Sequence, residues 1–335
     1  MNLNIASIGV GIGAGLASAL LLASIVSGSA FAFVLLWLSP LPLLIAGFGW
    51  GFGAALVGGV IASIALGSVT TYAFGLTFFL GIAGPSALLA LVVMLARPAE
   101  ESADPDVRAA GGYEWFPVGD IVEALAGMAA ILGVLFVLQY GWSFETYLEA
   151  LRPSVEGAIE LMRRIGGPGA SMPAAGSEAY QASVRFMAIV LPISLVSVVF
   201  LMLVLNTWIA GKIVVRSGRT ARPWPDVAAF AMPRRALFVT LGATLLGLFT
   251  SGIVGVLLGI VATAFLIAYM FQGLAVMHYV TRNRPARGVL LTFIYLSILF
   301  LSVPGLVLVV LGLLDTLMAF RRRFPPPPAK PHPFA

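Results

Sequence analysis

Four polar side chains that could support chemistry lie inside or at the edge of long apolar runs: Asn206, Gln272, His278 and Asp315. In a membrane a buried polar or charged side chain is costly, so each marks either a functional site or a polar contact between helices. We expect Asn206 and Gln272 to form hydrogen bonds between helices, and His278 to lie at the membrane interface. We expect Asp315, about two turns before Arg322, to form a structural ion pair with that arginine or a neighbouring one.

Residue types that carry most enzyme chemistry are scarce. The chain has no cysteine and only two histidines, His278 and His332, which excludes disulfides, thiol catalysis, thiolate metal sites and histidine-rich metal sites. It also lacks the motifs of serine hydrolases, zinc proteases, phosphate-binding loops and kinases. We therefore predict a protein that is not an enzyme and that binds no metal and no cofactor.

Small residues dominate the first apolar run, with glycine at every second position from Gly9 through Gly11 and Gly13 to Gly15. Glycines four residues apart allow two helix backbones to approach closely in lipid. We expect these pairs to pack inside the chain, with a docking face for another membrane protein as the alternative. The run is not a nucleotide-binding motif, because no strand precedes it and no phosphate-loop lysine follows.

A basic loop at residues 211–235 contains six Lys or Arg residues and one acid, Asp226. Its Arg222-Pro223-Trp224-Pro225 stretch places an aromatic ring between prolines and near several arginines. Such a loop attracts anionic lipid headgroups, and a partner-binding loop is the alternative. We do not expect nucleic acid as a partner, because the segment is short and tethered to a membrane.

The elements that must position these residues are transmembrane helices. Hydrophobic residues make up 60% of the 335-residue chain and charged residues 10%, against about 25% charged residues in soluble domains. Only helices and closed barrels satisfy their backbone in lipid, and the apolar runs do not alternate as barrel strands do. We predict an all-α polytopic bundle of about 8–10 spans, at residues 5–26, 31–48, 51–66, 70–96, 118–140, 185–209, 236–249, 253–277 and 288–320, the last broken at 302–305.

Charge predicts the orientation of these spans, because cytoplasmic loops are enriched in Lys and Arg. Three basic segments should face the cytoplasm: the loop 211–235, the loop 282–287 and the start of the tail at 321–323. We expect one membrane domain at 1–320 and a disordered basic, proline-rich tail at 321–335. The bacterial inner membrane, with the C-terminus in the cytoplasm, is the expected location.

The longest polar interruption, residues 141–181, then lies outside. Apolar residues recur in it every three or four positions, which indicates an amphipathic helix pair broken near Pro153. We expect this segment to lie on the membrane surface or to cap the bundle. A lid over an outward-facing cavity is the alternative.

Three short motifs carry a resemblance to a known family: Leu-Asn-Thr-Trp-Ile-Ala-Gly-Lys at 205–212, Arg-Pro-Trp-Pro at 222–225, and Leu-Leu-Asp at 313–315 before three arginines. The chain resembles the YybS-like family of bacterial membrane proteins (domain of unknown function 2232), above all its proteobacterial branch. That family is similar, distantly, to the substrate-binding membrane components of energy-coupling-factor vitamin transporters and to MreD-type rod-shape proteins. The resemblance implies a shared helical core and a glycine-rich first span that docks a transport partner.

Two functions fit these observations. The leading hypothesis is a solute-binding or transport component that lacks its own ATPase and works with an ATPase module or an ion gradient. The alternative is a non-catalytic scaffold in a cell-envelope biogenesis complex, suggested by the basic loop and the proline-rich tail. Membrane lipids are partners in either case, and another membrane protein is a candidate partner.

Overall fold

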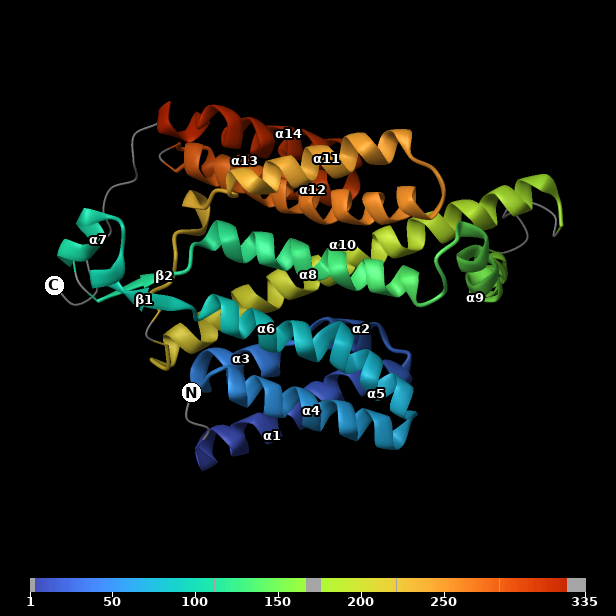
Figure 1. Ribbon diagram of the computed structural model, residues 1–335, viewed down its shortest axis with the longest axis horizontal. Coiled ribbons are helices and arrows are strands. Elements are labelled where there is room, and N and C mark those ends of the chain that lie inside the picture. The colour runs from blue at the N-terminus through green and yellow to red at the C-terminus, as the bar shows by residue number, and fades with distance from the viewer. Residues whose placement is uncertain (1–3, 111, 167–175, 221, 283, 324–335) are drawn as a thin grey trace.

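Helices in the computed structural model run back and forth along one axis, so that their connections gather at two ends (Figure 1). The structure describes residues 4–110, 112–166, 176–220, 222–282 and 284–323. One end holds the connections at 94–117, 217–233, 281–286 and 319–323, and we call it the basic end. The three basic segments of the sequence therefore lie together, as predicted, while the described residues 139–166 and 176–177 lie at the opposite end. The proline-rich tail from residue 324 is outside the described residues.

The N-terminal third forms a compact helical layer. Its elements are α1 (Ile5–Ala23), the short turn η1 (Ser24–Ser27), α2 (Ala30–Trp37), α3 (Leu41–Trp50), α4 (Phe52–Val69), α5 (Tyr72–Phe78), the π-helical turn η2 (Phe79–Ala83) and α6 (Gly84–Val93). Glycine allows α1 to pack directly on α4: a Cβ on Gly11 would lie 2.6 Å from the Ala54 carbonyl oxygen, and one on Gly15 would lie 2.3 Å from that of Gly58.

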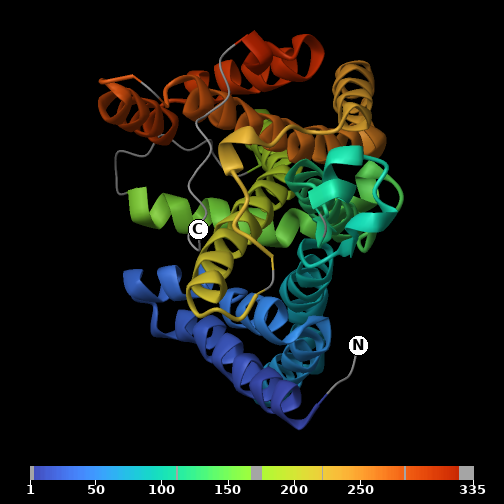
Figure 2. The same ribbon diagram turned by 90° about the vertical axis from the view of Figure 1, so that its left-hand side faces the viewer.

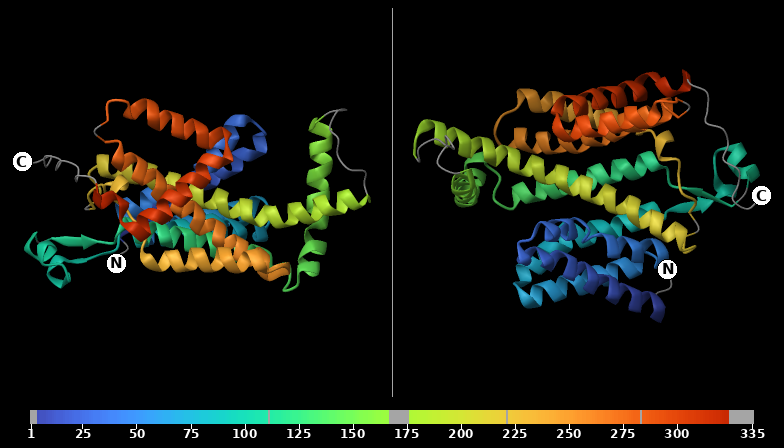
Figure 3. Two further views of the ribbon diagram at one scale, coloured as in Figure 1. Left: turned by 90° about the horizontal axis from the view of Figure 1, so that it is seen from above. Right: turned by 180° about the vertical axis from the view of Figure 1, so that it is seen from behind.

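Three long helices form the centre: α8 (Val118–Leu138), α10 (Glu178–Arg216) and α12 (Gly252–Val280). They meet at Gly133 of α8, where a Cβ would lie 2.3 Å from a methyl of Val196 and 2.9 Å from one of Ile260. The core here is built from fully buried aliphatic and aromatic side chains, among them Phe200, Leu203 and Tyr269. The 39-residue α10 crosses this centre and extends beyond the other helices at the end opposite the basic end (Figures 1 and 3).

The C-terminal layer consists of α11 (Arg234–Phe249), α13 (Arg287–Phe300) and α14 (Ser302–Met318), followed by the turn η5 (Phe320–Arg323). Helix α12 packs closely on α14, because a Cβ on Gly273 would lie 2.0 Å from the Leu308 carbonyl oxygen and one on Gly312 would lie 2.2 Å from that of Tyr269. The α13–α14 break falls at Leu301, just before the predicted residues 302–305, because Pro304 fits the first turn of α14, where its missing N–H has no helical partner.

The amphipathic segment forms one helix, α9 (Phe144–Gly166), that lies across the ends of the other helices (Figure 3). The predicted break near Pro153 is therefore wrong. Pro153 is on the exposed face, while Leu151 and Val155 beside it are buried in the core and hold the helix together. Tyr147 is also buried and donates a hydrogen bond to the Ala188 carbonyl oxygen of α10 at 2.7 Å. Helix α9 therefore covers the end of the bundle opposite the basic end, and its location outside the cell stays a prediction.

A small β-hairpin at the basic end was not predicted. Strands β1 (Ala96–Pro98) and β2 (Tyr113–Trp115) pair in antiparallel register, with the turn η3 (Ala99–Glu101) and helix α7 (Pro105–Ala110) between them. Arg97 Nε donates to Glu114 Oε2 at 2.7 Å on its exposed face, and this hydrogen bond holds the pKa of Glu114 below its ordinary value. Three-residue strands carry too little alternation to be recognised from sequence.

Seven helical segments within the described residues are long and apolar enough to cross a bilayer: Ile5–Ser27, Phe31–Trp50, Phe52–Val69, Tyr72–Val93, Val118–Leu138, Glu178–Arg216 and Gly252–Val280. The pair α13–α14, bent by 117°, makes an eighth if it counts as one span. Helix α11 has only 16 residues, a rise of about 24 Å against a hydrocarbon core of about 30 Å. The chain is thus an all-α polytopic membrane bundle, with seven or eight full spans.

The two faces of α1 give a test of this packing. Gly15→Ala should lower the stability by about 1–3 kcal/mol, because the new methyl group overlaps the α4 backbone. Gly13→Ala should instead raise it by up to about 1 kcal/mol, because a Cβ there meets nothing within 4 Å. Thermal unfolding of the two purified variants in the same detergent measures both effects. Equal shifts of the same sign would contradict the α1–α4 contact.

Candidate functional site

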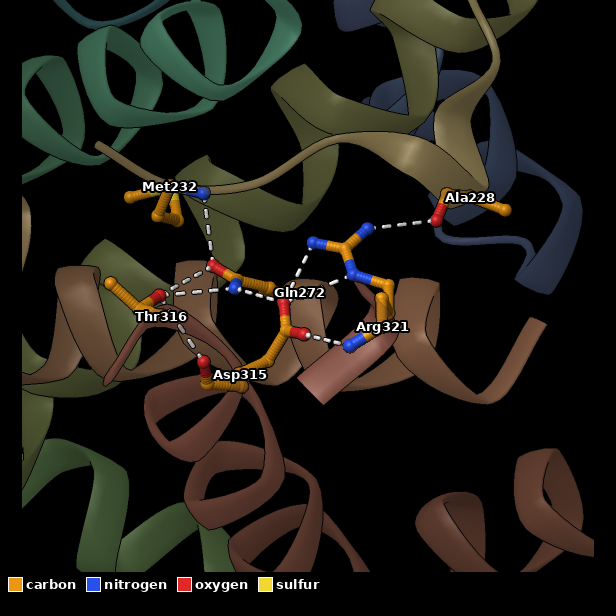
Figure 4. Close-up of polar contacts among 7 residues, drawn as sticks. Ala228, Met232, Gln272, Asp315, Thr316 and Arg321 are labelled. Atoms are coloured by element: carbon orange, nitrogen blue, oxygen red, sulfur yellow. Dashed lines mark hydrogen bonds and ion pairs between the residues drawn. The ribbon is translucent and has the colours of Figure 1, made fainter. Parts of the chain in front are cut away.

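A buried polar cluster at the basic end joins α12, α14 and the loop between α10 and α11 (Figure 4). Gln272 is fully buried at its centre. Its Nε2 donates to Asp315 Oδ2 at 2.8 Å and to Thr316 Oγ1 at 3.0 Å, while its Oε1 accepts from the backbone N–H of Met232 at 2.9 Å. Gln272 therefore forms the hydrogen bonds between helices that the sequence predicted, and it also fixes the loop.

Asp315 forms the expected ion pair, and its partner is Arg321. Arg321 Nη2 and Nε donate to Asp315 Oδ2 at 2.7 and 3.0 Å, with side-chain exposures of 11% and 3% for the two residues. Arg321 Nη1 also donates to the Ala228 carbonyl oxygen at 3.0 Å. The pair therefore anchors the same loop at a second point, four residues before Met232 (Figure 4).

Asn206 has a structural role in the centre of the bundle. Its Nδ2 donates at 2.7 Å to two carbonyl oxygens, that of Met202 in its own helix and that of Trp37 at the end of α2. The contact ties α10 to the N-terminal layer across 169 positions of sequence. His278 near the end of α12 has a different partner, since its Nε2 lies 2.8 Å from the hydroxyl of Tyr295 in α13.

A cavity of about 960 Å³ opens between these contacts. Its walls are mainly apolar side chains from α8, α10, α12 and α13, and its floor at the basic end is the loop at residues 220–230. The lining also includes the hydrogen-bonded pair of His278 and Tyr295, and Trp37 and Thr207. Helix α9 contributes nothing to this lining and lies at the other end of the bundle, so the cavity does not support the alternative of a lid over an outward-facing site.

The mouth of the cavity lies between α10 and α13. Exposed lining residues lie on these two helices, Leu205 and Trp208 on α10 and Tyr295 and Leu299 on α13, and also on the loop, at Pro223 and Val227. Figure 2, which looks onto the basic end, shows α10 and α13 apart from one another. Both helices belong to segments apolar and long enough to cross a bilayer, α10 by itself and α13 together with α14.

Arg222 is the charged group of the cavity. It is only 8% exposed, and its guanidinium donates to the carbonyl oxygens of Val93 and, at 2.8 Å, of Phe116. The guanidinium carbon lies 5.8 Å from the centre of the Trp115 ring. Burial lowers the pKa of Arg222, but an arginine stays protonated in proteins. The cavity thus has a permanent positive charge at its basic end.

Trp224 forms part of the same floor. Its ring lies against Gly211 of α10, where a Cβ would be 2.3 Å from the ring, and the Lys212 ammonium lies 4.5 Å from the ring centre. A side chain at position 211 would push the ring away, which explains the need for glycine there. The segments 205–212 and 222–225, separate in sequence, therefore meet at one site.

The remaining predicted residues lie elsewhere. Gly11 and Gly15 pack on α4, whereas Gly9 and Gly13 lie on the exposed face of α1 with nothing within 4 Å of an added Cβ. Within the described ranges no three His, Asp or Glu side chains come together as a metal site requires. Apart from the motifs at 205–212 and 222–225, the sequence singled out none of the apolar residues that form the cavity, because an apolar residue facing a cavity and one facing the core look the same in sequence.

We call the ion pair of Asp315 and Arg321, together with Gln272, the buried clamp. Removal of its carboxylate tests its contribution to stability. Asp315→Asn should destabilise the protein by about 3–5 kcal/mol, because it leaves the buried Arg321 guanidinium without a counter-charge. Glu114→Gln makes the same chemical change in the exposed pair with Arg97 and should leave the thermal midpoint almost unchanged, since water screens that pair. Thermal unfolding in detergent measures both variants. A decrease in the thermal midpoint that is no larger for Asp315→Asn than for Glu114→Gln would show that the clamp does not stabilise the fold.

Comparison with known proteins places the chain in a family. A family model described as "Predicted membrane protein (DUF2232)" matches residues 15–316, which include Gln272, Asp315 and the whole cavity lining but end before Arg321. No curated protein and no solved structure matches the chain. The match extends over most of the sequence, and the chain belongs to the DUF2232 family of membrane proteins.

Proposed function

We propose that this protein binds an amphipathic small molecule that enters from the bilayer, as the binding component of a transport system without its own ATPase. The observation that carries the proposal is the cavity of about 960 Å³ with its mouth between α10 and α13. Ligand sites have volumes of about 300–1,000 Å³ and mostly apolar walls with a few polar groups. Packed helix bundles leave few voids larger than a water molecule, so a space of this size favours an occupant.

The position of the mouth favours an amphipathic occupant over a water-soluble one. A polar solute would have to cross hydrocarbon to pass Leu205 and Leu299, whereas an acyl chain or another apolar tail would not. The indole ring of Trp208 and the hydroxyl of Tyr295, both partly exposed at the mouth, suit the membrane interface, where such side chains concentrate. The polar end of the ligand would then face the basic end.

We further propose that the basic end faces the cytoplasm of a bacterial inner membrane, with the C-terminus on the same side. The observation that supports this is the clustering of the arginines of all three basic segments at one end. Because the sequence has no phosphate-binding loop, any energy for release must come from a partner or an ion gradient. The scaffold alternative gains no support from the loop, since Trp224 and Arg222 face the cavity, and the tail is outside the described residues.

Filling the cavity tests the proposal. Val204 lines the cavity on α10, and Val204→Trp should displace the occupant. Val198→Trp is the matched control, because Val198 lies on the same helix, is 42% exposed and does not line the cavity. Native mass spectrometry of protein extracted in mild detergent should show a bound molecule in the wild type and the control, and at least about tenfold less in Val204→Trp.

Two outcomes would overturn the proposal. One is a wild-type protein that carries no bound amphiphile, even after incubation with a total lipid extract. The other is equal occupancy in Val204→Trp and Val198→Trp with both variants folded, which would place any bound lipid on the outer surface.

A further inference from the structure

We infer that the cavity selects amphiphiles with an anionic headgroup, and that the Arg222 guanidinium is the counter-charge that selects them. The inference rests on the proposed function, because it names the ligand class of the same cavity. It starts from a difference between Arg222 and the other well-buried or clustered arginines of the basic end.

Three arginines of the C-terminal half at this end have carboxylate partners. Arg321 pairs with Asp315, Arg282 with Asp226, and Arg235 with both Asp120 and Glu123. Arg222 is more than nine-tenths buried, yet among the described residues its hydrogen-bond partners are two carbonyl oxygens and no carboxylate. Arg222 is therefore a buried positive charge that has no carboxylate partner among the described residues.

A buried charge without a counter-charge is costly, and carbonyl dipoles replace only part of its hydration. The guanidinium has five N–H donors, and the two recorded carbonyl bonds leave donors for a ligand. Two oxygens of a carboxylate or phosphate group can accept two parallel hydrogen bonds from a guanidinium. An anion at this position would therefore remove the electrostatic cost and use the remaining donors.

The surroundings fit the rest of such a molecule. From Arg222 the cavity continues along α10 between apolar walls and reaches the mouth near Trp208 and Leu299. An anionic head at the floor and a hydrocarbon tail toward the bilayer would match this order of polar and apolar surface. Lys212, beside the Trp224 ring, adds a second positive charge close to the floor.

Two other occupants fit less well. A zwitterionic or neutral lipid would fill the apolar part but bring no net negative charge to Arg222. The chain's own tail, residues 324–335, contains Lys330 and no acidic side chain, so it does not offer the required charge along its length. Charge complementarity therefore favours a lipid-like acid, with either a phosphate or a carboxylate head.

The test uses the full-length protein in mild detergent and equimolar mixtures of defined lipids. Delipidated wild-type protein is incubated with phosphatidylglycerol and phosphatidylethanolamine of identical acyl chains, and in a second arm with oleate and oleyl alcohol. Native mass spectrometry then counts the bound molecules. We expect the anionic member of each pair to be enriched about tenfold over the other member. A larger enrichment of phosphatidylglycerol than of oleate would indicate a phosphate headgroup, and the reverse would indicate a carboxylate headgroup.

Three substitutions connect the preference to Arg222. Arg222→Gln should bind the anionic and the neutral lipid about equally, while the total amount of bound lipid persists. Arg222→Lys should keep most of the preference for the anionic lipid. Arg219→Gln is the control, because it removes the same charge from an exposed site of the same loop outside the cavity. It should leave the enrichment unchanged.

The outcomes separate this inference from the proposed function. Equal binding of anionic and neutral lipids by the wild type, or an enrichment that survives Arg222→Gln, would overturn the charge selection and leave the cavity function intact. A loss of enrichment in Arg219→Gln as large as in Arg222→Gln would overturn it as well, since surface charge would then be the cause. If Arg222→Gln does not fold, the wild-type enrichment and its retention in Arg222→Lys decide the question.

Discussion

Three side chains, Arg222, Gln272 and Arg321, hold one non-helical loop against the bundle, and the cavity depends on that attachment. Apart from the short 3-10 turn at Val227–Ala229, this loop has no helical hydrogen bonds for its backbone, and near a bilayer an unpaired polar group is costly. Arg321 binds the carbonyl oxygen of Ala228, and Gln272 accepts from the N–H of Met232. Arg222 donates in the opposite direction, to carbonyl oxygens at the ends of α6 and of the β2–α8 connection. A loop fixed at these points can form the floor of a cavity without collapsing into it.

The same attachment accounts for where charge is located in the site. Asp315 neutralises the charge of Arg321 and accepts a hydrogen bond from Gln272, so the clamp has no net charge. Arg222 uses neutral carbonyl partners instead, and its charge remains available to whatever enters beside it. Helix α12 connects the two regions, because Gln272 faces the clamp while Leu274 and His278 of the same helix line the cavity. Structural and ligand-facing polar groups are thus close in space but have different partners.

Much of this architecture can be predicted from sequence, because it depends on local composition. The lengths of the apolar runs predict the spans, the position of arginines predicts the shared end of three connections, and the spacing from Asp315 to the terminal arginines predicts an ion pair. Contacts between distant segments could not be predicted. The bond from Asn206 to the Trp37 carbonyl depends on how two helices cross, and the split of the glycines into packed Gly11 and Gly15 and open Gly9 and Gly13 depends on which face of α1 meets α4. Helix α9 continues through Pro153 because the free energy gained by burying its apolar face outweighs the helix-breaking effect of the proline. That burial cannot be read from the local sequence.

The central claim is that the space between α10 and α13 is a ligand site with Arg222 at its polar end. An experimental structure by cryo-electron microscopy, in nanodiscs made with native lipid, tests it most directly. The account predicts elongated density within the cavity, with its compact end in contact with the Arg222 guanidinium and its long end directed between Trp208 and Leu299. A structure in which α13 closes on α10 and side chains fill the space would contradict the account.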